Sequence, residues 1–218
     1  MERCEKALWE PIGANAREYL RARGLKDETI KRFRLGYENT RSGVSIPCFV
    51  KNRLWYVKFR QLAALPKYIL LKGSKPAAIF NADRLVNSFP CLFVEGEFDC
   101  ILSDQEFGDM LPVVTIGSAT NQPDLAAWGI YLIRPDITYI LPDNDEAGEL
   151  AATTIARSSR NPILASLPDK GCKDITDYYQ AGGNIGRWAC NLMEFHGPLP
   201  STWEGLAESI GGIIKKRA

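Results

Sequence analysis

This sequence of 218 residues lacks the marks of several common protein classes. It has one histidine and six cysteines, and no two cysteines form a Cys-x-x-Cys pair, so a zinc site of the usual spacing is not present. No segment approaches the ~18 consecutive apolar residues of a transmembrane helix, and the first six residues contain no apolar stretch of a secretory signal. No Gly-x-x-x-x-Gly-Lys-Ser/Thr loop is found, which argues against a P-loop motor. We therefore expect a cytoplasmic protein with reduced thiols, without zinc and without a membrane partner.

The net charge of +1 hides an uneven distribution of charge along the chain. Residues 1–88 contain 18 Lys and Arg against 8 Asp and Glu, whereas residues 89–218 contain 9 against 18. A basic part suits phosphate backbones and an acidic part supplies carboxylates, although a chance partition of surface charge would give the same counts. We expect three segments, at 1–88, 89–182 and 183–218.

The basic segment has the pattern of a small α+β unit. A helical hairpin is expected first, with Asp27 as the N-cap of its second helix and Gly24 ending the first. Two strands joined by a turn at Lys51 and Asn52 follow. The expected elements are helices over Asn15–Arg23 and Asp27–Phe33 and strands over Val44–Phe49 and Leu54–Arg60.

After Pro90 the pattern alternates between strands and helices. Such alternation predicts an α/β fold, a Rossmann-like and mostly parallel sheet with flanking helices, in which ligand chemistry gathers beyond the carboxyl ends of the strands. The expected strands are Cys91–Glu95, Val113–Ile116, Thr138–Leu141 and Ile163–Ser166, and the expected helices between them are Phe98–Phe107, Pro123–Tyr131 and Ala147–Arg157. Three C-terminal helices are expected over Ile175–Ala181, Gly186–Met193 and Thr202–Lys216.

Carboxylates follow two of these apolar strands. The string Phe-Val-Glu-Gly-Glu-Phe-Asp places Glu95 at a strand end and Asp99 on the opening turn of a helix, and Ile-Leu-Pro-Asp-Asn-Asp places Asp143 and Asp145 after another strand. Carboxylates brought close together repel one another and raise each other's pKa, so this arrangement favours a hard divalent cation such as Mg²⁺.

Glu95-Gly96 and Asp143-x-Asp145-x-x-Gly148 together resemble the two signature motifs of the Toprim family. That family includes bacterial-type primases, type IA and II topoisomerases, small nucleases and recombination mediators. The resemblance implies that Glu95, Asp143 and Asp145 are catalytic and bind metal, and that Gly96 and Gly148 permit tight turns and close backbone approach.

A third string, Lys-Asp-Ile-Thr-Asp-Tyr-Tyr, is similar to the acidic segment that adds metal ligands in primases. By this resemblance Asp174 is a further ligand. Two residues separate it from Asp177, where bacterial primases have an Asp-x-Asp, so Asp177 either joins the cluster or caps the next helix. Asp99 either orients the site or caps its own helix.

The segment before the acidic motifs narrows the resemblance to the catalytic core of DnaG-like bacterial and phage primases. Its opening helices and its Ser-Ile-Pro, Val-Lys-Phe-Arg and Pro-Lys-Tyr-Ile strings look like the basic subdomain of that core. The resemblance makes Tyr56 and Tyr68 candidates for base stacking, but each is as readily an ordinary core residue of the sheet. The residues expected to contact nucleic acid or nucleotide are Lys58, Arg60, Lys67, Tyr68 and Lys72. For Lys58 and Arg60, the alternative is a position on a solvated sheet edge.

The resemblance implies DNA primase activity, a metal-dependent nucleotidyl transfer that synthesises short RNA primers on a single-stranded DNA template during replication. Mg²⁺, with Mn²⁺ as a substitute, is the implied cofactor, and Glu95 is either a further ligand or the proton acceptor. Nucleoside triphosphates are the implied substrates and a replicative helicase is a candidate partner. The zinc-binding module that usually precedes this core is not found, so the chain is a fragment, a reduced primase or a protein of changed function. The alternatives are a metal-dependent DNA nuclease and a non-catalytic adaptor that binds single-stranded DNA.

Overall fold

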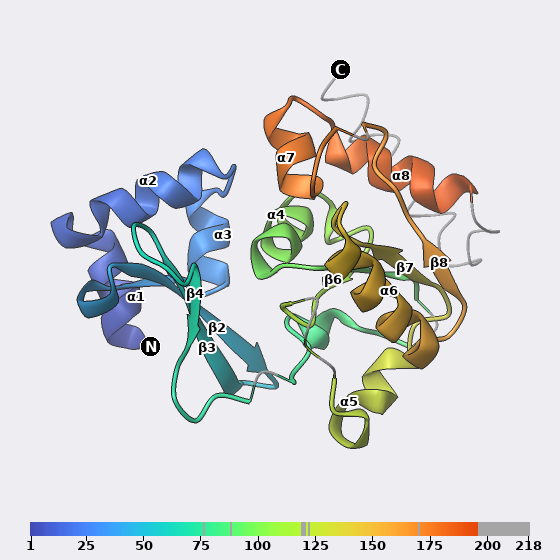
Figure 1. Ribbon diagram of the computed structural model, residues 1–218, viewed down its shortest axis with the longest axis horizontal. Coiled ribbons are helices and arrows are strands. Elements are labelled where there is room, and N and C mark those ends of the chain that lie inside the picture. Colours follow the sequence, from blue (N-terminus) through green and yellow to red (C-terminus); the bar gives the residue numbers. More distant parts are fainter. Residues whose placement is uncertain (76, 88, 119–120, 122, 170, 196–218) are drawn as a thin grey trace.

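The computed structural model describes residues 1–75, 77–87, 89–118, 121, 123–169 and 171–195. It contains two four-stranded sheets, with strand orders β1-β2-β3-β4 and β6-β5-β7-β8. The first sheet and its helices form the left-hand part of the molecule in Figure 1, and the second sheet with its helices forms the right-hand part. The predicted helix over Thr202–Lys216 lies outside the described residues.

The N-terminal part is an antiparallel sheet with three helices beside it. Its strands are β1 (Gly36–Glu38), β2 (Gly43–Val50), β3 (Arg53–Gln61) and β4 (Tyr68–Leu70). Its helices are α1 (Glu2–Trp9), α2 (Ala14–Ala22) and α3 (Asp27–Arg32), and short 3₁₀ turns occur at Pro11–Gly13, Asn39–Arg41 and, after the sheet, Ala82–Arg84. The predicted helical hairpin and strand pair are present, but α1 was not predicted. Half of its residues are charged and Leu8 alone is buried, so its helicity depends on packing against β1.

Two turns of this part test the local predictions. Lys51 and Asn52 have φ values of 50° and 59°, the left-handed conformation of a two-residue hairpin turn, which confirms the predicted turn. Gly24, with φ of 89°, follows α2 as predicted. The prediction for Asp27 was wrong, because this residue is already inside α3 and makes no capping bond. Its carboxylate instead accepts hydrogen bonds of 2.9 and 2.7 Å from the Arg21 guanidinium.

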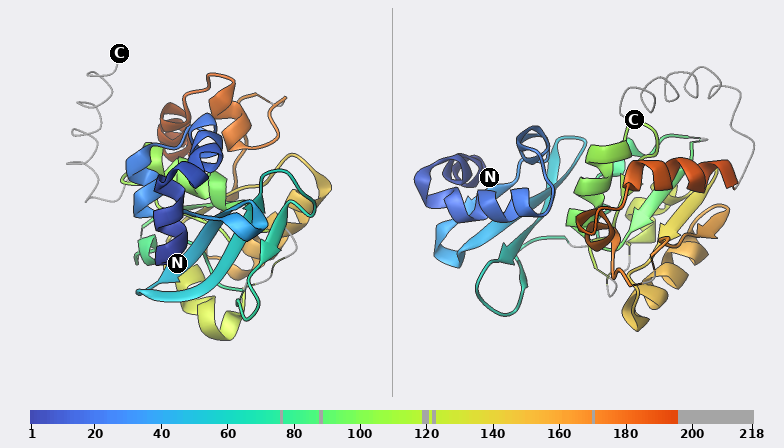
Figure 2. Two further views of the ribbon diagram at one scale, coloured as in Figure 1. Left: turned by 90° about the vertical axis from the view of Figure 1, so that its left-hand side faces the viewer. Right: turned by 90° about the horizontal axis from the view of Figure 1, so that it is seen from above.

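The second sheet is parallel throughout, as the alternating pattern predicted. Its strands are β5 (Cys91–Val94), β6 (Val113–Val114), β7 (Thr138–Leu141) and β8 (Pro162–Leu164). The helices of this part are α4 (Glu97–Phe107), α5 (Leu125–Leu132), α6 (Glu146–Ser158), α7 (Ile175–Gln180) and α8 (Ile185–Phe195). α4, α7 and α8 pack together on one face of the sheet and α6 covers the other (Figures 1 and 2). Every residue of β5 and β7 is buried, as expected for strands covered on both sides.

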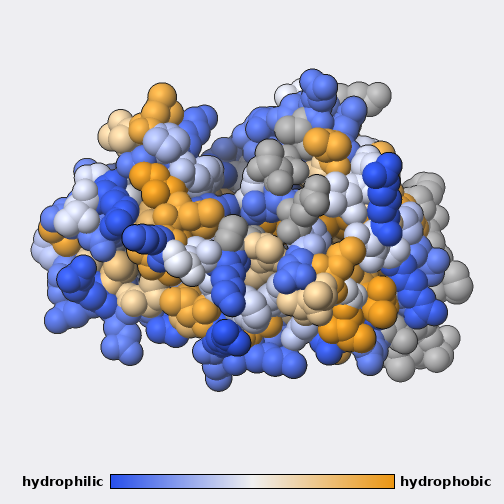
Figure 3. All heavy atoms as spheres, turned by 60° about the horizontal axis from the view of Figure 1, so that its bottom comes forward, coloured by the Kyte–Doolittle hydropathy of each residue, from blue (hydrophilic) through white to orange (hydrophobic). Residues whose placement is uncertain are grey.

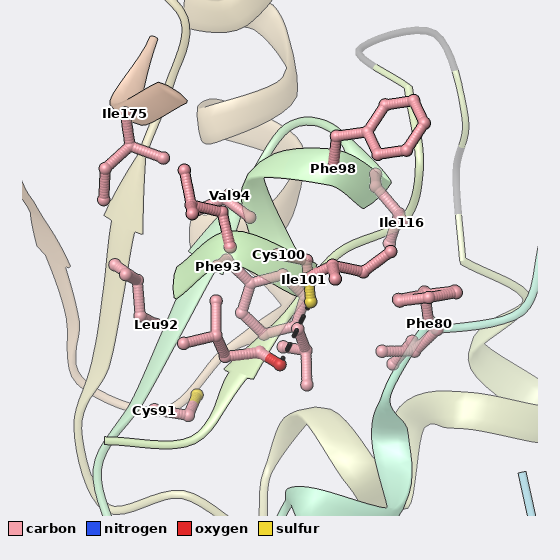
Figure 4. Packing of buried hydrophobic residues seen from close by; sticks show 14 of the residues in the cluster. Phe80, Cys91, Leu92, Phe93, Val94, Phe98, Cys100, Ile101, Ile116 and Ile175 are labelled. Carbon is pink, nitrogen blue, oxygen red and sulfur yellow. Dashed lines mark hydrogen bonds between the residues drawn. The ribbon is translucent and has the colours of Figure 1, made fainter. Parts of the chain in front are cut away.

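The core of the second part packs α4 onto the sheet. Leu92 and Ile101 are fully buried there, and the Cys100 thiol donates a hydrogen bond of 3.2 Å to the main-chain oxygen of Val113 (Figure 4). Phe80 reaches this core from the segment that joins the two parts, and it stacks on Phe33 of the N-terminal part with ring centroids 5.8 Å apart. The core is therefore continuous across the junction between the two sheets.

Buried charge also joins the two parts. Asp104 of α4 has a fully buried side chain, and Arg32 approaches its Oδ2 atom to 2.6 Å. Arg84 and the Asn81 amide reach Oδ1 of the same carboxylate at 3.4 and 3.1 Å. A buried carboxylate needs such partners, so Asp104 fixes the N-terminal part against α4.

The face of the molecule shown in Figure 3 is mainly hydrophilic, with separate hydrophobic patches. All six cysteines are free thiols. Among the described residues, no helix is both long and apolar enough to cross a membrane.

Candidate functional site

The acidic residues of the first two motifs lie at one edge of the parallel sheet. β5 and β7 are hydrogen-bonded neighbours, with Val94 paired to Leu141 at their carboxyl ends. Glu95 follows β5 directly, and Asp143 follows β7 after one proline. Because neighbouring parallel strands end at the same edge, the fold brings these two carboxylates together, as predicted.

Glu95 is held by its main chain and leaves part of its carboxylate without a partner. Its main-chain oxygen accepts a hydrogen bond of 2.7 Å from the Thr115 hydroxyl, which itself accepts one from the amide of Gly117. The Oε2 atom is buried and has no hydrogen-bond partner within the described structure. Burial, followed by the charges of Asp143 and Asp145, raises the pKa of Glu95 to about 7. A buried carboxylate oxygen without a hydrogen-bond partner destabilises the folded state, so Oε2 of Glu95 favours a further ligand.

Asp143 and Asp145 share the ammonium group of Lys173. The Nζ atom lies 3.1 Å from Oδ2 of Asp143 and 3.5 Å from Oδ2 of Asp145. Burial raises the pKa of Asp143, and the hydrogen bond from Lys173 opposes this effect in part. The other oxygen of Asp145, Oδ1, caps α6 by accepting a hydrogen bond of 2.9 Å from the amide of Gly148.

Asp174 stands in the same relation to α7 as Asp145 does to α6. It is the N-cap of α7, and its Oδ1 atom accepts a hydrogen bond of 2.8 Å from the amide of Asp177. Asp177 therefore lies in the first turn of the helix and does not cap it, so the capping role considered for Asp177 belongs to Asp174.

Asp99 faces the acidic cluster from α4. It does not cap its helix, because Gly96 occupies the cap position without a side-chain bond. Its buried carboxylate accepts a hydrogen bond of 2.5 Å from the hydroxyl of Thr176 on α7. Burial, together with the charge of Asp174, raises the pKa of Asp99 well above its usual range. The side chain thus ties α4 to the segment that carries Asp174.

The two predicted glycines permit close contacts around these acids. A Cβ atom on Gly96 would lie 2.7 Å from Oδ2 of Asp99. A Cβ atom on Gly148 would overlap the main chain of Asp143. Neither glycine has a positive φ, so the structure requires the small side chain for space and not for an unusual backbone conformation.

The cluster fits a hard divalent cation by its chemistry. In the part of the chain that the structure describes, no three His, Cys, Asp or Glu side chains already stand as a ligand group, and the ammonium of Lys173 lies between two of the acids. The orphaned Oε2 of Glu95 and the raised pKa values of Glu95, Asp143 and Asp99 are features that a divalent cation would relieve. Carboxylate oxygens are the ligands that Mg²⁺ prefers.

A small, open depression adjoins the cluster at the carboxyl ends of the strands. Glu95 and Gly148 contribute to its wall, together with apolar residues such as Ile116 and Ile155. The acidic cluster is therefore accessible from the sheet edge where a substrate would enter an α/β fold.

Lys58 differs from the surface cation that was expected. It is buried, and its Nζ atom lies 2.5 Å from Oε1 of Glu97, which is also buried. The main-chain oxygen of Gly117 accepts a further hydrogen bond from the ammonium, and the hydroxyl of Tyr56 donates to Oε1 of Glu97 at 3.0 Å. The alternative of a solvated sheet edge is wrong for Lys58, and Tyr56 is a core residue and not a stacking platform.

The other expected contact residues lie nearer the surface. Lys67, Tyr68 and Lys72 are exposed, and Arg60 is half-buried. The Arg60 guanidinium lies 5.2 Å from the ring centroid of Tyr68, and its Nε donates a hydrogen bond of 3.0 Å to the hydroxyl of Tyr19. These residues form a cationic and aromatic surface on β3 and β4, next to the buried ion pair of Lys58.

Three functional features were not assigned from the sequence. Glu97 was read only as part of the acidic string, and its buried partner Lys58 could not be paired with it across 39 positions of sequence. Arg23 lies over the ring of Phe98 at 4.8 Å and acts electrostatically on Asp99. Lys173 was part of the third motif but received no role, although a lysine beside an aspartate was a visible signal.

Comparison with known proteins supports the fold. No protein-family model matches the chain, and no curated protein sequence matches it. Solved structures do match. A DNA primase domain from Pseudomonas aeruginosa has a TM-score of 0.68 at 19% identity, with 86% of this chain and 74% of that chain covered. The primase fragment of the bacteriophage T7 primase-helicase has a TM-score of 0.65 at 22% identity, with coverage of 78% and 72%.

A DnaG primase catalytic domain bound to single-stranded DNA is also similar. Its TM-score is 0.67 at 19% identity, and 86% of this chain and 76% of that chain are covered. Each of these matches covers more than three quarters of this chain. The chain therefore has the fold of the catalytic cores of DnaG-type primases.

Proposed function

We propose that this chain is the catalytic core of a DNA primase, which synthesises short RNA primers on single-stranded DNA in a metal-dependent reaction. One observation carries the proposal. Within a primase-core fold, three separate loops deliver Glu95, Asp143, Asp145 and Asp174 to the same edge of the parallel sheet. Fold alone does not determine an activity, but this acidic cluster is the part of the fold at which two-metal phosphoryl chemistry would take place.

The four acids would hold Mg²⁺, and each is prepared for that role by its own surroundings. Glu95 offers the orphaned Oε2 atom, which favours a ligand over a freely solvated base. Asp145 and Asp174 each use Oδ1 as a helix cap, which holds the carboxylate at the start of its helix. Bound Mg²⁺ would lower the pKa of the attacking 3′-hydroxyl and neutralise charge on the transferred phosphate.

Nucleic acid and nucleotides would meet the cationic surface beside this cluster. We assign the template and nucleoside triphosphate contacts to Arg60, Lys67, Tyr68 and Lys72, because these residues are accessible in β3, β4 and the loops next to them. Lys58 would support this surface from below through its pair with Glu97. Matched primase structures contain single-stranded DNA or a DNA oligomer with a six-nucleotide overhang, which supports DNA as the partner.

A replicative helicase is the proposed protein partner. The matched T7 fragment comes from a primase-helicase protein, and another matched structure shows primase domains of that phage with a DNA polymerase and an RNA/DNA hybrid. Since this sequence has no P-loop motor, a helicase would act in trans or from another segment.

Primer synthesis by wild type and Asp143→Asn tests the proposal. Purified protein is incubated with single-stranded DNA, four ribonucleoside triphosphates, one of them labelled, and Mg²⁺ or Mn²⁺. We expect short labelled oligonucleotides from the wild type and a loss of at least about a hundredfold in Asp143→Asn, because one ligand carboxylate is removed while its shape is kept. Asp109→Asn is the matched control, since that carboxylate is fully exposed and follows the C-terminal end of α4, away from Glu95 at its start.

The result also separates the alternatives. Circular dichroism must show that Asp143→Asn is folded, because an unfolded variant would not report on chemistry. Shortened template without nucleotides would replace the proposal with a nuclease. Bound but unaltered DNA, with no product from the wild type under either metal, would replace it with a binding adaptor.

A further inference from the structure

Lys173 holds a position that the proposed function leaves unexplained. Its ammonium lies 3.1 Å from one acid of the cluster and 3.5 Å from another, which are Asp143 and Asp145. These are the two carboxylates of the Asp-x-Asp motif, where a cation ligated by both would have to lie. A lysine cannot be a metal ligand while it is protonated, so the ammonium and a divalent cation compete for the same oxygens.

The main chain of Lys173 fixes this placement. Its carbonyl oxygen accepts a hydrogen bond of 2.9 Å from the amide of Asn144, the residue between the two aspartates. The following residue, Asp174, caps α7 and is thereby anchored as well. The backbone on both sides of the ion pair is therefore tied down, and the side chain can leave without moving the loop.

The side chain itself is able to leave. It is 56% exposed, so the stem and the ammonium are largely in water on one side. Ion pairs this exposed are weak, since water screens them and a long side chain loses freedom in forming them. The carboxylates are more buried than the lysine, with 13% of the Asp143 side chain exposed. The arrangement is that of a replaceable cation on a fixed anionic site.

We propose that Lys173 is an internal counter-ion of the acidic cluster, which neutralises Asp143 and Asp145 before metal binds and is displaced by the divalent cation. Lys173 is thus a positioning residue that lowers the apparent affinity for metal and keeps the unliganded cluster from opening through repulsion. This inference rests on the proposed function for the identity of the cation. It does not require that primers be made.

Direct binding of MgCl₂ and MnCl₂, measured by isothermal titration calorimetry, tests the competition. Lys173→Met keeps the length of the stem and removes the charge, so we expect it to bind Mg²⁺ about three- to tenfold more tightly than the wild type, given two exposed ion pairs to break. Lys173→Arg keeps the charge and should stay within about twofold of the wild type. Arg157→Met is the matched control: it removes one positive charge at the far end of α6, roughly 18 Å along the helix from Asp145, and should bind as the wild type does.

Thermal unfolding distinguishes displacement from simple long-range repulsion. In EDTA, Lys173→Met should unfold at a lower temperature than the wild type, because its carboxylates lose their counter-ion. In saturating Mg²⁺ the two should unfold at the same temperature. If Lys173→Met and the wild type unfold at the same temperature in EDTA, or if Lys173→Met binds Mg²⁺ no more tightly than the wild type, the inference is wrong.

Two further outcomes are assigned in advance. Unchanged metal affinity with weakened DNA or nucleotide binding in Lys173→Met would make Lys173 a phosphate contact and would overturn the counter-ion role. Binding of Mg²⁺ that Asp143→Asn does not weaken would instead show that the metal site itself was misplaced, and the proposed function would fail with it. Tighter binding by Lys173→Met in a protein that makes no primers would keep the inference and refute only the primase reading.

Discussion

Replacing Lys58 by methionine is expected to lower the free energy of unfolding by about 3–5 kcal/mol, the usual cost of removing one partner from a buried ion pair. The estimate follows from the geometry of the pair. The side chain of Lys58 is 10% exposed and that of Glu97 is 3% exposed, and the two charged atoms lie 2.5 Å apart. With the ammonium gone, the charge of Glu97 would have no cation beside it in the described structure, and the Tyr56 hydroxyl would still donate to its Oε1 atom. A domain of this kind is stabilised by roughly 5–15 kcal/mol in total, so the loss would be easily measured.

A double-mutant cycle gives the reasoning a sharper test. Glu97→Gln removes the charge that Lys58→Met would leave unpaired, so the double variant should recover about 2 kcal/mol or more relative to the sum of the single changes. Urea unfolding followed by circular dichroism supplies all four free energies. Lys75→Met, at an exposed lysine, should change the free energy of unfolding by less than about 0.5 kcal/mol. A loss below about 1 kcal/mol for Lys58→Met, or additive effects in the double variant, would refute the account of a buried pair.

The other predictions concern the acidic cluster. The pKa of Glu95 is raised from 4.5 to about 7 in the folded state, so between these pH values the folded protein holds a proton that the unfolded chain has lost. In EDTA, the free energy of unfolding should therefore fall as the pH rises from about 4.5 to 7. The slope should be at most about 1.4 kcal/mol per pH unit for this group, and Mg²⁺ should reduce it; a flat profile from urea unfolding in EDTA would contradict the raised pKa. Gly148→Ala should destabilise the fold by about 1–3 kcal/mol and reduce primer synthesis, because the added methyl group meets the main chain of Asp143. Gly129 faces open space in α5, so Gly129→Ala should leave the free energy of unfolding in urea unchanged or raise it. Equal effects of Gly148→Ala and Gly129→Ala would count against the close contact at Gly148.

Much of the fold could be predicted because its signals are local. β5 and β7 appear as short, mainly apolar runs followed by carboxylates, the pattern of buried parallel strands. The strand over Thr138–Leu141 was predicted to the residue, and the other strands of this sheet differ by one or two residues at their ends. Helix ends fray in this way, and caps such as Asp145 fix them only where a side chain bonds to the backbone.

The errors of prediction share one cause. α1 was missed because its short, charged sequence has little helical signal of its own, and packing against β1 supplies the rest. Asp27 was expected to be a cap, but a bidentate pair with Arg21 was available to it instead. Lys58 was expected to be an accessible phosphate contact, whereas it is buried in a pair with Glu97 of α4 and donates to the main chain of Gly117. In each case, a contact with another element outweighed a local preference.

The sequence alone determined which residues carry the chemistry and on which side of the sheet they meet, because strand direction places Glu95 and Asp143 at carboxyl ends whatever the details of packing. The tertiary structure alone decided the charge state and the partners of those residues. Burial and neighbouring charges raise the pKa of Glu95, Thr176 reaches Asp99 from α7, and Lys173 neutralises the Asp-x-Asp pair. Electrostatic energy depends on distances and on the exclusion of water, which arise only when distant segments pack together.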